Sequence, residues 1–188
     1  MKVLGISGSL RRGSYNSTLL RAAVDLLPPS AQLEVFDGLK AVEPYDADDD
    51  VGGGPAGARR LRDAIESDDA ILIATPEYNS SVPGQLKNAI DWASRPLGEN
   101  AIWGKPVAVV GASTGMFGAV WSQAELRKAL SASGARVIEK DLPVGHAHQA
   151  FTSDGRLADV ELHGRYVELL EELVAPAEQT GRTERLAA

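Results

Sequence analysis

The sequence predicts a three-layer α/β fold built around a five-stranded parallel sheet. Short apolar runs alternate with stretches whose apolar residues recur at helical spacing, and this strand-helix unit repeats five times along the chain. The runs are apolar on successive rather than alternate residues, which is typical of strands that are covered on both faces. Right-handed crossovers then place helices on both sides of the sheet.

The elements are expected in strict alternation. The predicted strands are residues 3–6, 33–36, 70–74, 107–110 and, more weakly, 136–142. The predicted helices are residues 18–27, 58–65, 85–93, 119–132 and 160–174. Residues 37–54 contain an acidic run and three consecutive glycines, so we expect a long surface loop there, and a solvated loop is favoured over a cation site.

The length of 188 residues fits one domain, which we place at residues 1–174, followed by a flexible tail at residues 175–188 with few apolar side chains. Hydrophobic residues make up 44% of the chain and charged residues 24%, as in ordinary globular proteins. No run is long enough to span a membrane and no signal peptide is recognisable, so we expect a cytoplasmic protein without a membrane partner.

Charge and cysteine content exclude several classes of function. The net charge of −7 argues against a nucleic-acid partner, because phosphate backbones require a basic face. With no cysteine, the chain has no disulfide, thiolate nucleophile or iron–sulfur cluster, so any redox chemistry must come from a bound cofactor. His146 and His148 lie close together in the sequence, but no cysteine or suitably spaced carboxylate accompanies them, and we expect no metal site.

The first loop, residues 8–17, has the composition of a phosphate-binding loop. Its glycines let the backbone approach an anion, and the helix that follows offers unpaired N–H groups and a favourable dipole. The sequence lacks the Gly-Lys-Ser/Thr ending of a nucleotide triphosphate loop and the Gly-x-Gly-x-x-Gly pattern, which leaves a phosphomonoester site or an ordinary helix cap. The candidate side-chain donors, including the residue after the loop, are Ser9, Arg11 or Arg12, Ser14, Asn16, Ser17 and Thr18.

Two further loops follow expected strands at the same edge of the sheet. The second loop, residues 76–84, has two prolines that restrict its backbone and Tyr78, whose ring suits a flat heterocycle. We expect the backbone N–H groups of residues 77–79 to face the crevice. The third loop, residues 111–118, contains three glycines that permit close approach to a ligand. Since ligands of open parallel sheets bind beyond the strand ends, the three loops together predict a mononucleotide with a planar ring.

These motifs resemble those of the NAD(P)H-dependent FMN reductase family, which includes bacterial quinone, chromate and azo-dye reductases. The resemblance rests on residues 8–16, on the long motif of residues 76–92 and on the glycine loop of residues 113–118. It implies a flavodoxin-like fold with strand order 2-1-3-4-5. It also implies that Arg11, Ser14, Asn16, Ser17 and Thr18 hold the FMN phosphate, that Pro76, Glu77, Tyr78 and Asn79 line the isoalloxazine, and that Ser113 and Gly115 lie near the ring or ribityl chain.

The resemblance further implies that the flavin carries the chemistry, so that no catalytic side chain is needed. NADH or NADPH, a choice left open, would deliver hydride, and a small-molecule acceptor such as a quinone would then take two electrons by a ping-pong route. The alternatives are a flavodoxin-type electron carrier and a flavin-binding module without turnover. Lys87, Asn88 and Asp91 are expected to support the second loop rather than to act in catalysis.

A symmetric dimer or tetramer is also implied, with residues 85–93 and 119–132 as contact surfaces. Chromate-reducing members of the family tend to place an arginine and a tyrosine at the positions of Trp121 and Ala124. This departure leaves the polar network of a tetramer, and any preference for chromate, open. Trp92 and Trp103 fit a subunit contact and core packing equally well.

Overall fold

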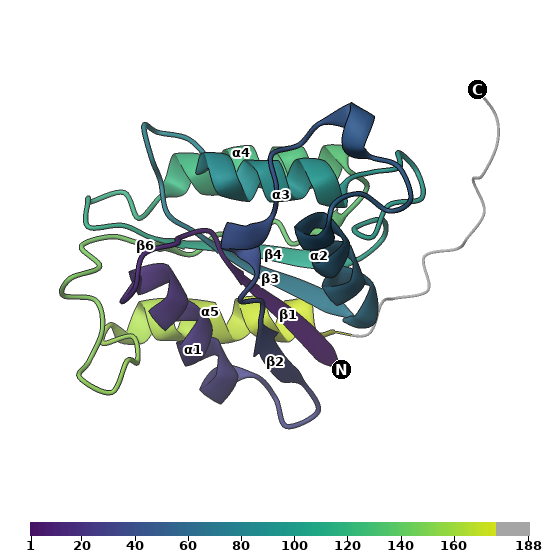
Figure 1. Ribbon diagram of the computed structural model, residues 1–188. Coiled ribbons are helices and arrows are strands. Elements are labelled where there is room, and N and C mark those ends of the chain that lie inside the picture. Colours follow the sequence, from purple (N-terminus) through teal and green to yellow (C-terminus); the bar gives the residue numbers. More distant parts are fainter. Residues whose placement is uncertain (176–188) are drawn as a thin grey trace.

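The computed structural model describes residues 1–175, and it has a parallel sheet between two layers of helices (Figure 1). The predicted C-terminal tail lies, from residue 176 on, outside the described residues. The strand order β2-β1-β3-β4-β5 confirms the predicted topology, and a sixth strand pairs with β4. The strands are β1 (Lys2–Ser7), β2 (Gln32–Val35), β3 (Ala70–Thr75), β4 (Pro106–Ala112), β5 (Arg136–Val137) and β6 (Pro143–Val144).

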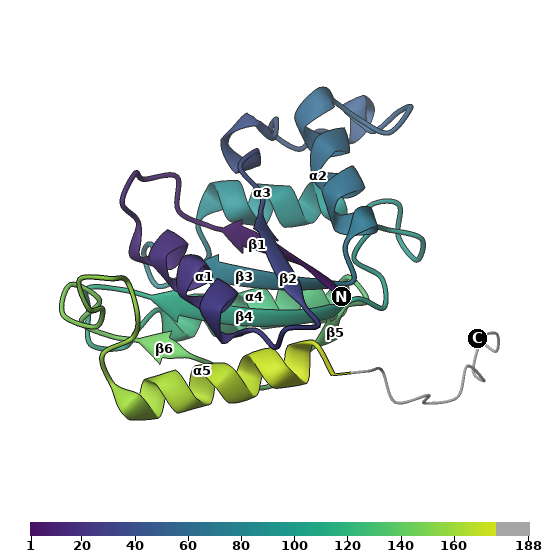
Figure 2. The same ribbon diagram turned by 90° about the horizontal axis from the view of Figure 1, so that it is seen from below.

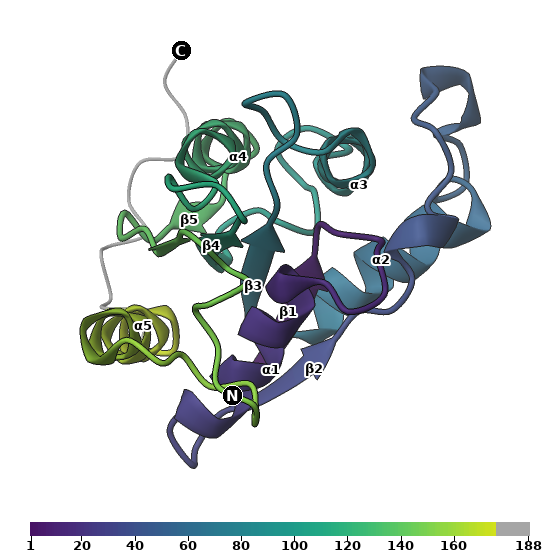
Figure 3. The ribbon, with the colours of Figure 1, turned by 90° about the vertical axis from the view of Figure 1, so that its left-hand side faces the viewer.

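The two helical layers lie on opposite faces of the sheet (Figure 3). Helices α1 (Tyr15–Leu26) and α5 (Val160–Leu173) cover one face, whereas α2 (Ala56–Ser67), α3 (Gly84–Ala93) and α4 (Val120–Ala132) cover the other. The central strands β3 and β4 are buried at every position, as continuous apolar runs predict. Among the helices of residues 1–175, none is long and apolar enough to cross a membrane.

The predicted strand at residues 136–142 is wrong beyond Val137, because β5 ends there and the next strand, β6, begins only at Pro143, after the predicted range. The main-chain N–H of Ile138 still donates to Val107 at 2.8 Å, and the carbonyl of Leu142 accepts from Gly111 at 3.1 Å. Between them, the charged residues 139–141 leave the sheet, and Lys140 pairs with Glu172 of α5 at 3.2 Å. Charged side chains are costly inside a covered sheet, so the chain bends outward where they occur.

The segment 37–54 is more ordered than a surface loop. It contains two short 3-10 helices, η1 (Leu39–Ala41) and η2 (Ala47–Asp49), and it buries Leu39 and Val42 in the core. Gln85 of α3 holds it in place, because its Nε2 donates to the carbonyl oxygens of Leu39 and Val42, both at 2.8 Å. The buried apolar residues that precede the acidic run explain the difference.

The polar side chains of α3 have two separate roles. Lys87 pairs with Asp91 on the helix surface at 2.6 Å, as the spacing predicts. Asn88 supports the segment 37–54 rather than the second loop, because its Nδ2 donates to the Glu43 carbonyl oxygen at 2.9 Å and its Oδ1 accepts from the Tyr45 N–H at 2.7 Å. Trp92 is fully buried, so it packs in the core, whereas Trp103 is largely exposed.

Candidate functional site

The loops after β1, β3 and β4 gather at one end of the sheet (Figure 2), where they surround an open cleft of about 190 Å³. Most of the predicted site residues line it, but Ser17, Thr18, Asn79 and Gly115 do not. Tyr15, Ala112 and Thr114 line it as well, although the sequence analysis did not select them. The complete lining is Ser9, Arg11, Ser14, Tyr15, Asn16, Pro76, Glu77, Tyr78, Ala112, Ser113 and Thr114.

The first loop precedes α1, and several of its main-chain N–H groups have no acceptor among the described residues. Ser14 is buried and caps the helix, since its Oγ accepts from the N–H of Asn16 at 3.2 Å, and α1 therefore begins at Tyr15 rather than at Thr18. For the N–H groups of residues 9–13, no acceptor is found in the part of the chain that the structure describes. These donors point to an anion site in addition to the cap.

Several polar side chains at the end of the first loop form hydrogen bonds with other residues of the chain. Asn16 is buried, and its Nδ2 donates to the Ala112 carbonyl oxygen while its Oδ1 accepts from the Ala112 N–H, both at 2.9 Å. The hydroxyl of Ser17 lies 3.0 Å from that of Ser7, and the hydroxyl of Thr18 donates to the Ser14 carbonyl oxygen at 3.3 Å. These contacts hold the start of α1 against β1 and β4.

An aromatic stack supports Arg11 beside the cleft. The guanidinium lies 5.6 Å from the centroid of the Tyr15 ring, and Tyr15 stacks on Phe151 with a centroid distance of 6.2 Å and an interplanar angle of 3°. Phe151 belongs to a small hairpin, residues 150–158, in which it pairs with Leu157. This hairpin follows no pattern that the sequence analysis detected.

The second loop contains a tight turn. Tyr78 and Ser81 exchange two main-chain hydrogen bonds, both of 3.1 Å, while Asn79 and Ser80 between them have φ angles of 54° and 58°. The prediction that the Tyr78 N–H faces the crevice is therefore wrong, because that group donates within the turn. The Tyr78 ring lies at the cleft and is 54% exposed. Glu77 lines the cleft too, and its Oε2 accepts from the N–H groups of Trp121 and Ser122 at the start of α4.

The third loop is fixed by β6 and the residues that follow it. The N–H of Ser113 donates to Val144, and the carbonyl of Ser113 accepts from Ala147, both at 3.0 Å. Gly118 has a φ of 57°, and a Cβ there would lie 2.4 Å from the carbonyl carbon of Pro143, so only glycine fits. Within residues 1–175, no group of three or more metal-ligating side chains is found.

The predicted cofactor can be tested against this arrangement. Ser9 and Arg11, two of the first-loop residues with free N–H groups, line the cleft, and Pro76 and Tyr78 contribute an apolar and aromatic part. An anion at one end and a planar ring at the other require this division, so the residues fit FMN.

Comparison with known proteins decides the family. Residues 1–149 match the family model described as NADPH-dependent FMN reductase. The chain belongs to this family. It is 46% identical over 160 residues to an NAD(P)H-dependent FMN reductase of Pseudomonas aeruginosa, covering 85% of each protein. It is 39% identical over 141 residues to a quinone reductase of Escherichia coli K12, covering 74% of each.

Solved structures agree with this assignment. The flavoenzyme NAD(P)H:(acceptor) oxidoreductase of Paracoccus denitrificans superposes with a TM-score of 0.75 at 35% identity, over 91% of this chain and 97% of that one. A flavodoxin variant of Pseudomonas aeruginosa, with a TM-score of 0.56 at 18% identity over 92% of this chain and 95% of that one, shares the fold alone. The predicted family, the use of FMN and NAD(P)H, and the oxidoreductase class are therefore confirmed.

In this FMN reductase, large exposed apolar side chains occur on the second loop, on the third loop and at the start of α4. Tyr78, Met116, Phe117 and Trp121 are all about half exposed or more, and the rings of Phe117 and Trp121 meet at a centroid distance of 5.0 Å. We call these four residues the apolar surface.

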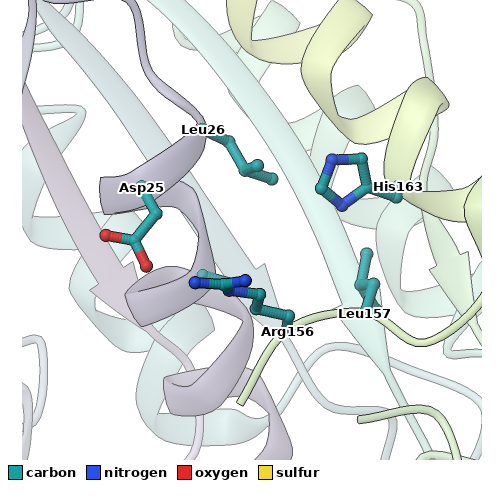
Figure 4. A pocket seen from close by; sticks show the side chains of 6 residues that line it. Asp25, Leu26, Arg156, Leu157 and His163 are labelled. Carbon is teal, nitrogen blue, oxygen red and sulfur yellow. The ribbon is translucent and has the colours of Figure 1, made fainter. Parts of the chain in front are cut away.

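A second hollow of about 200 Å³ lies between α1, the start of α5 and the hairpin (Figure 4). Its apolar floor includes Leu26 and Leu157, and His163 projects toward them (Figure 4). Asp25 and Arg156 lie at its exposed rim. None of its lining residues comes from the three loops, so it is separate from the cleft.

Proposed function

We propose that the protein reduces quinones and related planar acceptors with electrons from NADH or NADPH. The observation that carries this proposal is the convergence of the three loops on one open cleft whose two ends suit the phosphate and the ring of FMN. Relatives that are named quinone reductases support the choice of acceptor. Bound FMN supplies the chemistry, since its ring accepts a hydride from a nicotinamide and passes two electrons on to an acceptor.

The protein residues bind and orient in this proposal. The free N–H groups of residues 9–13 and the Arg11 guanidinium bind the phosphate. Asn16 acts indirectly, because its two hydrogen bonds to Ala112 hold the phosphate end and the ring end of the cleft at a fixed separation. Pro76 and Tyr78 lie against the ring. No side chain is required to move a proton.

Donor and acceptor use the same space in turn. The cleft is open, and FMN bound in it would present one exposed side of its ring. If nicotinamide and quinone both use that side, they bind one after the other, and ping-pong kinetics are expected. Double-reciprocal plots at several quinone concentrations should be parallel, and intersecting plots would require a ternary complex instead.

A second copy of the chain is proposed to cover the apolar surface. The support is that one of its members, Tyr78, lines the open cleft, and that all four side chains are large, apolar and exposed, so a dimer or tetramer would bury them. Sedimentation should report a dimer or larger species at micromolar concentration, and Trp121→Glu should shift it toward monomer. A wild-type protein that sediments only as monomer contradicts this part. The cytoplasmic location stays a prediction that cell fractionation can check.

The central test is anaerobic addition of NADPH, and separately NADH, to the purified protein loaded with FMN. Loss of the visible flavin absorbance before any quinone is added supports the enzyme. An absorbance that does not change with either nicotinamide supports a flavodoxin-type carrier. Flavin that stays bound without turnover with any acceptor would favour a binding module.

A further inference from the structure

Helix α4 begins without a cap from its own sequence. Its N-cap residue is Ala119, which has no side-chain acceptor and a φ of 62°, where asparagine, aspartate, serine or threonine would be usual. The first N–H groups of the helix therefore need an acceptor from elsewhere in the chain.

Glu77 of the second loop supplies this acceptor. Its Oε2 lies 3.0 Å from the main-chain nitrogen of Trp121 and 3.2 Å from that of Ser122. A carboxylate at the positive end of a helix dipole is favourable, so the contact joins the loop and the helix electrostatically as well as by hydrogen bonds. Glu77 also lines the cleft. One residue thus contacts the helix and lies where we place the cofactor.

Two neighbouring contacts join the end of β3 and the second loop to the same helix. Before Glu77, the buried hydroxyl of Thr75 lies 2.8 Å from that of Ser122. After it, the Ser81 hydroxyl donates to Oε2 of Glu125 at 2.5 Å. Tyr78 lies between these two attachments, so the position of its ring depends on α4, the helix that also continues the third loop.

We propose that Glu77 is a positioning residue for the flavin and that its charge sets the reduction potential of the bound cofactor. Its carboxylate holds the Tyr78 side of the cleft at a fixed distance from the third loop. Its negative charge opposes the positive end of α4 beside a ring that gains electron density on reduction, and so lowers the potential. This proposal rests on the proposed function, since it concerns the ring end of the same cleft.

The test compares Glu77→Gln, Glu77→Asp and Glu77→Ala in the FMN-loaded protein. Midpoint potentials are measured by equilibration with reference dyes, and FMN affinity by fluorescence titration of the apoprotein. Glu77→Gln keeps an acceptor oxygen but loses the charge, so the potential should become more positive while FMN affinity changes little. Glu77→Asp keeps the charge, and its potential should stay near that of the wild type. Glu77→Ala loses both bonds, and FMN affinity should fall about tenfold or more.

Glu66→Gln is the matched control, because it removes the same charge from an exposed site on α2 outside the cleft. Its potential should equal that of the wild type. If Glu77→Gln and Glu66→Gln have the same potential, the inference about charge is overturned. If Glu77→Ala binds FMN as the wild type does, the inference about position is overturned. A wild-type protein that binds no FMN refutes the proposed function instead, so the two failures can be distinguished.

Discussion

The contact between Asn16 and Ala112 gives the most direct prediction for this cleft. Asn16→Ala removes a buried amide that makes two hydrogen bonds of 2.9 Å, and it leaves the N–H and C=O of Ala112 without those partners. An unsatisfied buried polar group costs about 1–3 kcal/mol of folding stability. The N–H and C=O of Ala112 together would therefore cost at most about 2–6 kcal/mol. Because Ala112 lines an open cleft, water can replace part of the loss, and we expect a decrease of about 2–3 kcal/mol in the free energy of unfolding.

Urea unfolding of the apoprotein measures this loss, and FMN titration measures its effect on the site. Asn100 offers a matched control, because it is also buried and joins two segments, with bonds to the Ser133 carbonyl oxygen at 3.1 Å and the Ile102 N–H at 3.0 Å. Asn100→Ala should destabilise the fold to a similar extent and leave FMN affinity unchanged. Asn16→Ala should weaken FMN binding about tenfold, since the two ends of the cleft lose their connection. A change in stability below about 0.5 kcal/mol, or equal FMN affinities of the two variants, would refute the reasoning.

Three further predictions concern the first loop and acid stability. Arg11→Ala should weaken FMN binding by about 1.5–3 kcal/mol and leave riboflavin binding nearly unchanged, and equal effects on both ligands in apoprotein titrations would show that Arg11 does not contact the phosphate. Phe151→Ala removes the stack on Tyr15 and should also weaken FMN more than riboflavin, whereas Phe151→Leu should restore part of the affinity. The pKa of Glu43 lies below its usual 4.5 because its own main-chain N–H and that of Gly57 stabilise the carboxylate. Its contribution to stability is therefore complete above the unfolded pKa and is lost as the pH falls through the lower folded pKa, so urea midpoints measured from pH 7 to pH 3 should decrease less steeply in Glu43→Gln.

The strands of the sheet could be predicted because the apolar pattern of each strand lies in one short stretch of sequence. Continuous apolar runs identify covered strands without knowledge of their neighbours, and the run at residues 70–74 is buried throughout. The same reasoning failed at residues 136–142, where three charged residues interrupt the ladder and one of them, Lys140, pairs with Glu172 of α5, which lies later in the chain. It also failed at residues 37–54, since burial of Leu39 and Val42 depends on Gln85 of α3.

The location of the site could be predicted from the sequence, but the hydrogen-bond partners of its side chains could not. Motif composition selected most residues that line the cleft. It assigned Asn16 to the phosphate, whereas the amide bonds Ala112, which lies 96 residues away in the sequence. It assigned Glu77 to the ring, whereas the carboxylate also caps α4. Whether a polar side chain is free to bind a ligand depends on distant neighbours, and one sequence does not contain that information.

The hairpin at residues 150–158 lies just beyond residues 1–149, the part that the family model matches. Its Phe151 nevertheless supports Tyr15 and thereby Arg11, while Leu157 on its returning strand lines the separate hollow beside α5. The phosphate end of the cleft therefore depends on a segment that follows the residues matched by the family model. A substitution confined to this hairpin can change how strongly the protein retains its cofactor without altering any of the three loops, because its effect reaches Arg11 through the Tyr15 ring.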